Sequence, residues 1–156
     1  LRVALKILKE KGLNLKLIII GRMDYDAEEG WIERCGAYSQ EDAPALFQSA
    51  HIFLHLKCLD PCPTAVLEAL ACGVPVIGLD NGGMPELVDG KSGILIPSPQ
   101  DFEKFHYPNA DEVADAILKV KNNLEEMSHS ARNRSLKFDK EIWLKGHEEI
   151  FNQLLK

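Results

Sequence analysis

The sequence lacks the features that mark membrane, secreted and nucleic-acid-binding proteins. In its 156 residues no apolar run approaches the roughly 20 residues needed to cross a bilayer, and the first residues are typical of an amphipathic helix, not of a signal peptide. Basic residues number 18 against 24 acidic ones, a net charge of -6, and they are scattered along the chain, which disfavours a polyanion-binding surface. We therefore expect an intracellular, cytoplasmic protein with no transmembrane segment and no nucleic-acid partner.

Cysteine is scarce, with four residues in the chain. They lack the paired CxxC spacing of a zinc site and are too few for a disulfide-rich secreted domain, so we expect mostly buried thiols. His51 and His55 are four residues apart, which on a strand separates them by about 13 Å, too far to share a metal without further ligands. We expect core or surface histidines and no metal site.

What is present is the composition of an ordinary globular domain, with 46% apolar and 27% charged residues. At about 150 residues per domain, the length predicts one domain over 1–156. An amphipathic helix is expected to end near Lys11. Unbroken apolar runs, typical of strands buried on both faces of a parallel sheet, follow at 17–20, 31–35, 52–56, 74–79 and 94–96.

Helical patterns alternate with these runs, at about 40–49, at 64–72, from Asn109 onward and after Asp139. Ser39 with Asp42, and Asn109 with Glu112, offer capping boxes. This alternation predicts an α/β fold with a doubly wound parallel sheet, which binds ligands outside the carboxyl ends of its strands. Glycine, proline and polar residues concentrate at that edge, in 21–22, 36–38, 57–64, 80–83 and 97–99.

The last of these edge segments continues into a loop that is longer than expected, PSPQDFEKFHYPNA at 97–110. It contains Phe102, Phe105 and Tyr107. We expect these rings to pack over the edge of the sheet, with a lid over the ligand site as the alternative.

Residues 58–73, CLDPCPTAVLEALACG, are the most informative for chemistry. Their helix is almost wholly apolar, yet it contains Glu68. Thr64 lies one turn earlier on the same face, so Glu68 and the amino end of the helix face one point in space. Free amides and the dipole at such an end suit an anion, commonly a diphosphate, and a nearby carboxylate accepts hydrogen bonds from sugar hydroxyls. The alternative is a simple ion pair of Glu68 with Arg22 or Lys57.

A second candidate phosphate cradle follows the next strand, in DNGGMPELVDG at 80–90. Gly82 and Gly83 permit positive φ and close backbone approach, and Pro85 suits the first turn of a short helix. A Gly-Gly turn is also common in purely structural loops. The strand rule places this turn beside Thr64, which favours a shared site.

These motifs, strongest over 46–97, resemble the carboxy-terminal, donor-binding domain of a GT-B glycosyltransferase of the retaining family 4 type. The resemblance rests on LEALACGVPV, on an acidic pair separated by seven residues, and on GGMPE. It implies a Rossmann-like domain that forms the C-terminal half of a GT-B fold, with a nucleotide diphosphate sugar as donor substrate and without a metal or other cofactor. The amino-terminal, acceptor-binding GT-B domain would be the partner of this half, and the acceptor is not indicated.

The resemblance also assigns roles to individual residues. Asp60 would face hydroxyls of the transferred sugar and Glu68 the ribose, as the catalytic pair. Amides at Thr64, Ala65 and Val66 would hold the diphosphate. The remaining donor-binding positions are the backbone at Ala37 and Tyr38, near the base, together with Gly21, Arg22, Cys62, Pro63, Gly82 and Gly83.

The sequence departs from the family pattern in several places. The family carries Gly-Phe after the first acid, where Pro61 and Cys62 stand here, and Pro61 has no N–H to offer a sugar hydroxyl. Asp60 is one methylene shorter than the usual Glu. The family's first strand, with the Arg and Lys that neutralise the diphosphate, is not in this sequence, which would leave the second and fourth strands of that fold without their shared neighbour. We therefore expect the 156-residue chain to bind donor weakly and to turn over nothing.

The leading hypothesis is the nucleotide-sugar-binding domain of a retaining glycosyltransferase, an enzyme of the hexosyltransferase type when complete. One alternative is a non-catalytic Rossmann-like binding or interaction module, favoured by Pro61, Cys62 and the missing cations. Another is part of a GT-B sugar-nucleotide epimerase, which the LEALACGVPV and GGMPE motifs fit less well.

Overall fold

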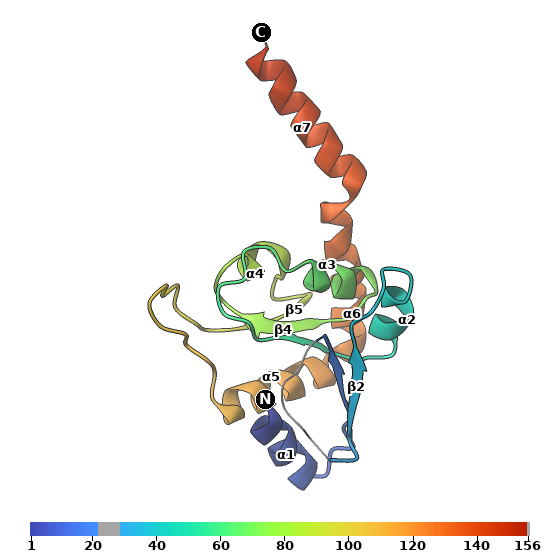
Figure 1. The fold of residues 1–156 in the computed structure, drawn as a ribbon, viewed down its shortest axis with the longest axis vertical. Coiled ribbons are helices and arrows are strands. Elements are labelled where there is room, and N and C mark those ends of the chain that lie inside the picture. The colour runs from blue at the N-terminus through green and yellow to red at the C-terminus, as the bar shows by residue number, and fades with distance from the viewer. Residues whose placement is uncertain (22–28, 156) are drawn as a thin grey trace.

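Parallel strands alternate with helices along the chain, which confirms the predicted α/β class (Figure 1). The structure is a computed structural model that describes residues 1–21 and 29–155. Its strands lie within one or two residues of the predicted apolar runs: β1 (Leu17–Ile20), β2 (Ile32–Gly36), β3 (Phe53–His55), β4 (Val76–Leu79) and β5 (Gly93–Ile96).

The helices include all those expected and one that was not. They are α1 (Arg2–Glu10), α2 (Ala43–Gln48), α3 (Thr64–Ala71), the short α4 (Met84–Leu87), α5 (Ala110–Asn122), α6 (Leu124–Ser135), a 3-10 turn η1 (Leu136–Phe138) and α7 (Lys140–Leu154). The missed helix is α6. Its sequence is mostly polar and buries only Ala131, so it has no apolar stripe to find.

The strands form two parallel sheets instead of one continuous sheet. One has the order β1-β2 and the other β3-β4-β5, with Phe53 opposite Val76 and Val76 opposite Gly93. Within the described residues, β1 and β3 are not hydrogen-bonded to each other. Each therefore leaves one edge without a strand neighbour in this part of the chain.

The core lies on the two faces of β4, whose residues are all buried. Ile77 and Leu79 pack with α1 and α5, while Val76 packs with α3 and with Ala131 of α6. Helices therefore cover both faces of this sheet, as a doubly wound arrangement requires. The loops at the carboxyl ends of β3 and β4 are held on this rigid base.

Burial on both faces, which was predicted for every strand, does not hold for β2. Four of its five residues are exposed. The strand carries Glu33 and Arg34, and Glu33 forms an ion pair with Lys16. Charged side chains therefore keep this strand at the surface.

The expectation of mostly buried thiols is wrong for two of the four cysteines. Cys35 on β2 and Cys62 before α3 are both exposed.

Phe102 and Phe105 of the long loop after β5 do not pack over the sheet edge, so the prediction is wrong for these two rings. Tyr107 is also largely exposed but borders a hollow beside Leu54 of β3. Phe102 is 83%, Phe105 69% and Tyr107 65% exposed. The loop is closed instead by its own polar contacts around Asp101, which leave the rings facing outward.

The last helix, α7, extends away from the rest of the molecule (Figure 1). It buries none of its residues, although it carries Trp143, Ile150 and Phe151, all more than half exposed. Within the two described ranges, no helix has the length and apolar content needed to span a bilayer.

Candidate functional site

The glycine turn after β4 lies directly against the segment that follows β3, as the strand rule predicted. The Gly83 N–H donates to the Asp60 carbonyl at 2.9 Å. A Cβ on Gly82, whose φ is +58°, would stand 2.5 Å from the same oxygen, and a Cβ on Gly83 would stand 2.1 Å from Pro61 O. Glycine is therefore required by close backbone approach, and the Gly83 amide is occupied within the protein and cannot also donate to a phosphate here.

A buried asparagine fixes this turn, and sequence reasoning missed it. Asn81 is 1% exposed. Its Oδ1 accepts from the Leu59 N–H and its Nδ2 donates to Ser98 Oγ, both at 2.9 Å. Leu59 has a positive φ of 54°, which a non-glycine residue keeps only when its surroundings hold it. The available signal was a polar residue at the end of a wholly buried strand.

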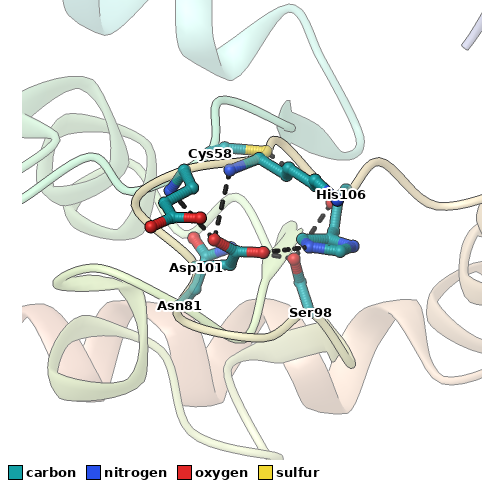
Figure 2. Close-up of polar contacts among 7 residues, drawn as sticks. Cys58, Asn81, Ser98, Asp101 and His106 are labelled. Carbon is teal, nitrogen blue, oxygen red and sulfur yellow. Dashed lines mark hydrogen bonds and ion pairs between the residues drawn. The ribbon is translucent and has the colours of Figure 1, made fainter.

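Ser98 extends the same network into the long loop after β5 (Figure 2). The Ser98 hydroxyl donates to the His106 carbonyl at 3.0 Å, and Cys58 Sγ lies 3.6 Å from that oxygen. The His106 ring lies 2.8 Å from the Asp101 carboxylate, whose pKa is lowered mainly by this hydrogen bond. The segments after β3, β4 and β5 are thus tied together at one edge of the sheet.

Asp60, the first of the predicted catalytic pair, lies between two basic side chains and is only 14% exposed. Lys57 Nζ is 3.1 Å and His55 Nε2 is 3.3 Å from Asp60 Oδ2. Burial pushes the pKa of Asp60 upward, but the ammonium of Lys57 and the backbone amide of Cys62 outweigh it, so the pKa lies below the usual value of Asp. Asp60 is therefore a carboxylate at neutral pH.

His55 was predicted to be a core or surface histidine, and its contact with Asp60 was missed. Its Nε2 has no hydrogen bond of good geometry to a described residue, although Asp60 is close. Burial lowers the pKa of His55 in spite of that carboxylate. The ring is neutral over a wider pH range than an exposed histidine.

Glu68, the second acid, is bound by a tyrosine from a different element. The Tyr38 hydroxyl, just after β2, donates to Glu68 Oε2 on α3 at 2.5 Å. Burial, together with the hydrogen bond and charge of Glu68, raises the pKa of Tyr38 to about 12. The alternative that Glu68 pairs with Lys57 is wrong, because Lys57 is paired with Asp60; its other candidate partner, Arg22, lies outside the described residues.

A row of rings joins the surroundings of the two acids. Tyr38 packs edge-on against Phe47 at 5.8 Å between centroids, and Phe47 packs edge-on against Phe53 at 5.3 Å. Phe53 stacks with His55 at 6.3 Å. The polar ends of this row, Tyr38 and His55, are the residues that contact the two carboxylates.

The amino end of α3 leaves two of the three predicted amides free. The Val66 N–H donates to Pro63 O at 3.0 Å, so its amide is used within the helix. The Thr64 and Ala65 N–H groups donate to no other described residue, and the helix has no side-chain cap. These two amides, at the positive end of the helix dipole, are available to an anion.

A hollow of about 360 Å³ opens beside Glu68, between α3 and the segment from α6 to α7. Leu67 and Glu68 of α3 line one side. The other side carries charges of both signs, from Arg132, Asp139 and Lys140. A second hollow, of about 330 Å³, lies along β3 away from the acids, between Leu54, Leu56 and Val113.

The remaining predicted donor-binding positions are only partly placed. Gly21 follows β1 directly and donates its N–H to Gly36 O at 2.6 Å, with a positive φ of 87°. Ala37 is exposed immediately before Tyr38. The role predicted for each of them is not tested by these contacts.

The fold is that of a Rossmann-like domain of the GT-B type. Solved structures of similar fold include the pneumococcal O-GlcNAc transferase GtfA in complex with UDP and GlcNAc, at 24% identity and a TM-score of 0.70 over 98% of this chain and 31% of that one. The GtfA/B complex matches with a TM-score of 0.76 at 18% identity, over 97% of this chain and 32% of the other. At these identities the likeness shows the fold.

The sequence itself identifies the family. Residues 1–123 match the family described as Glycosyl transferases group 1, and the chain belongs to it. A probable sucrose-phosphate synthase of Thermosipho melanesiensis is 32% identical over 123 residues, 76% of this chain and 26% of that protein. A putative colanic acid biosynthesis glycosyltransferase, WcaL, of Escherichia coli is 26% identical over 153 residues, 83% of this chain and 38% of that protein. The chain thus spans well under half the length of these relatives.

Proposed function

We propose that this chain is the donor-binding domain of a retaining glycosyltransferase, which transfers a sugar from a nucleoside diphosphate sugar to an acceptor. The observation that carries the proposal is the placement of Asp60 and Glu68. Asp60 follows β3, and Glu68 lies one turn into helix α3, which begins shortly after it. Asp60 is paired with Lys57, and Glu68 is bound by Tyr38. Family membership supports this function, as do relatives of similar fold solved with UDP and with UDP-glucose.

In this proposal each part of the donor meets a different group. The free amides of Thr64 and Ala65 receive the diphosphate, and Glu68 accepts hydrogen bonds from the ribose. The base lies near the backbone of Ala37 and Tyr38. Asp60, a carboxylate at neutral pH, receives hydroxyls of the sugar.

The diphosphate leaving group gains negative charge as its bond to the sugar breaks, so nearby positive charge stabilises it. Lys57, whose side chain is 69% exposed, is the nearest described cation to Asp60 and can reach toward a bound donor. Gly83 takes no part, since its amide is bound to Asp60. The proposal includes no metal ion and no cofactor other than the donor itself.

We further propose that the rest of a longer polypeptide completes this domain and supplies the acceptor site in an amino-terminal GT-B domain. Among residues 1–21 and 29–155, β1 and β3 each have an edge without a strand neighbour, which offers a place for another strand. An apolar hollow lies beside Leu54 and Leu56. The uncovered apolar side chains of α7 offer a second contact surface. Relatives that extend far beyond the matched region support this arrangement.

One observation favours the alternative of a non-catalytic module. Lys57 is paired with Asp60, so the charges of this acid and this cation offset each other. Nucleotide binding distinguishes the two functions, because a donor-binding domain requires it and a non-catalytic module does not. The epimerase alternative has no such support and is disfavoured by the family match.

Calorimetric titration of the chain with UDP, GDP and ADP, and with their sugar derivatives, tests the proposal. Saturable binding that is lost in Glu68→Ala and kept in Glu148→Ala, an exposed residue of α7, supports a donor site and identifies its base. The absence of binding both by the folded wild-type chain and by a longer chain that restores the upstream sequence overturns donor binding by this domain and favours the module.

A further inference from the structure

We propose that Tyr38 is a positioning residue, which orients Glu68 toward the ribose and so sets a preference for ribonucleotides over 2′-deoxyribonucleotides. The inference rests on the proposed function, in which Glu68 receives the ribose. It goes beyond it, because the resemblance assigns only the backbone of Tyr38, at the base, and gives its side chain no role.

The contact itself fixes one oxygen of the carboxylate. A phenol donating to a carboxylate at 2.5 Å is a short, charge-assisted hydrogen bond. A glutamate side chain has three rotatable bonds and adopts many rotamers when nothing holds its end. Because Oε2 is bound to Tyr38, the plane of the carboxylate is set, and Oε1, which has no hydrogen bond to any described residue, is left to accept from a ligand.

Tyr38 can serve as an anchor because its own ring is held. It packs edge-on against Phe47, which is 2% exposed and packs in turn against Phe53. Edge-to-face pairs of this kind have a preferred geometry. The position of the Tyr38 hydroxyl is therefore fixed by the packing of its ring against the core.

The polar pair is not explained by packing alone. A phenylalanine would fill the same space beside Phe47, and a partly buried hydroxyl or carboxylate without a partner is costly. The residues come from segments 30 positions apart in sequence, so the contact joins the proposed base-binding segment after β2 to the proposed ribose-binding helix α3. Through this hydrogen bond, the position of the base-binding segment affects the position of Glu68 on the ribose-binding helix.

The ribose hydroxyl is the ligand group that separates this role from a structural one. A merely structural hydrogen bond stabilises the fold equally whichever nucleotide is bound. A positioning residue changes the binding of the nucleotide that carries the 2′-hydroxyl and leaves its deoxy analogue nearly unchanged. A double comparison of protein variant and ligand therefore isolates the effect.

The experiment is calorimetric titration of the wild-type chain, Tyr38→Phe and the control Tyr107→Phe with UDP and 2′-deoxy-UDP, or with the corresponding guanosine or adenosine pair. Tyr107 is an exposed tyrosine of the long loop and lies outside the proposed site. We expect Tyr38→Phe to weaken binding of the ribonucleotide about 10-fold, as for the loss of one hydrogen bond to a charged group, and to change the deoxy analogue less than about 2-fold. Tyr107→Phe should change neither.

The outcomes distinguish this inference from the function on which it rests. Wild-type binding with the same ribose preference in Tyr38→Phe overturns the inference and leaves the proposed function standing. Tighter ribonucleotide binding by Tyr38→Phe also overturns it, because the phenol would then compete with the ribose for Glu68. Failure of the folded wild type to bind any nucleotide, both as this chain and with the upstream sequence restored, overturns the proposed function, and the inference with it. Should Tyr38→Phe not fold, Phe47→Leu, which removes the ring that holds Tyr38 in place, must show the same loss of ribose preference.

Discussion

Gly83 and Pro61 approach so closely that no side chain fits between them, since a Cβ on Gly83 would stand 2.1 Å from Pro61 O. The oxygen belongs to the backbone, and the position of a Cβ is fixed by the backbone, so neither atom can rotate away. We expect Gly83→Ala to lower the free energy of unfolding by about 3 kcal/mol, at the upper end of the usual cost of overpacking. Urea denaturation measures the loss. Gly90→Ala is the matched control, because nothing lies within 4 Å of a Cβ there; equal stability of the two variants would contradict the predicted clash.

Asn81 gives a second prediction about the same turn (Figure 2). Asn81→Ala leaves the Leu59 N–H without its acceptor and removes the donor to Ser98. We expect a loss of about 2–4 kcal/mol of stability, from one cavity and one unsatisfied buried amide. Thermal or urea unfolding measures it, with Asn122→Ala, an exposed residue of α5, as control. A change of less than about 0.5 kcal/mol, the range of ordinary surface substitutions, would show that the network does not hold the turn.

The Tyr38–Glu68 pair predicts a change in tyrosine ionisation that requires no ligand. Burial, the hydrogen bond and the charge of Glu68 raise the pKa of Tyr38 to about 12. Glu68→Gln removes the charge that opposes a tyrosinate, so Tyr38 should ionise at a lower pH than in the wild type. Ultraviolet absorbance of tyrosinate, with circular dichroism to confirm folding at each pH, follows the change. Glu148→Gln should leave the titration curve as it is, and identical curves for wild type and Glu68→Gln would argue against the contact.

The parts of this structure that could be predicted from sequence are those with a local, periodic signal. The capping box of Asn109 and Glu112 is present with both hydrogen bonds, because its residues are three apart. The apolar run of β4 is buried throughout. Glu68 stood out because it interrupts an apolar helix. In each case the sequence signal is a pattern of residues that lie within a few positions of one another.

What could not be predicted depends on contacts between distant segments. Tyr38 and Glu68 are 30 residues apart, and no pattern in the chain indicates that a hydroxyl after β2 will reach α3. The same holds for Asn81 and Leu59, 22 residues apart. The prediction that the aromatic rings of the loop after β5 are packed was wrong for a different reason. The polar turn around Asp101 outweighed the tendency of Phe102 to be buried. Hydrophobicity predicts burial only where the backbone can bring the side chain to the core.

Asp89 predicts a pH dependence of stability in the acid range. Burial works to raise the pKa of Asp89, but hydrogen bonds from Ser92 and Lys91 and the charge of Arg134 outweigh it, and the pKa is lowered. A carboxyl whose pKa is lower in the folded than in the unfolded state binds fewer protons when folded. Its stabilising contribution is therefore present above the unfolded value of about 4 and is lost as the pH falls through the folded value.

Asp89→Asn should remove this contribution while keeping an oxygen that accepts from the Ser92 amide. We expect its free energy of unfolding to fall less steeply than that of the wild type between about pH 5 and pH 2. Urea denaturation at a series of pH values gives the two slopes. Asp115→Asn, at an exposed position of α5, is the control. A slope for Asp89→Asn equal to that of the wild type would contradict the assignment.

We expect that removing the final helix, α7, leaves the stability of the rest of the chain nearly unchanged. Because α7 buries none of its side chains, a chain that ends at Asp139 should melt within about 2 °C of the longer one, less than the shift expected for 1 kcal/mol. A chain that ends at Asn123 also loses α6, whose Ala131 is fully buried in the core beside α3, and should be strongly destabilised. Differential scanning calorimetry distinguishes the two variants.

We expect this difference because a helix that packs against nothing adds little to the free energy of unfolding. Helices of this length are marginal in water unless one face is packed, and α7 keeps Trp143 and Phe151 in solvent. If the shorter chain ending at Asp139 melts far below the longer one, α7 stabilises the domain through contacts with it, and its apolar face is not free. If the two melt together, the helix adds no stability to this domain, and covering its apolar side chains requires a surface that these residues do not supply.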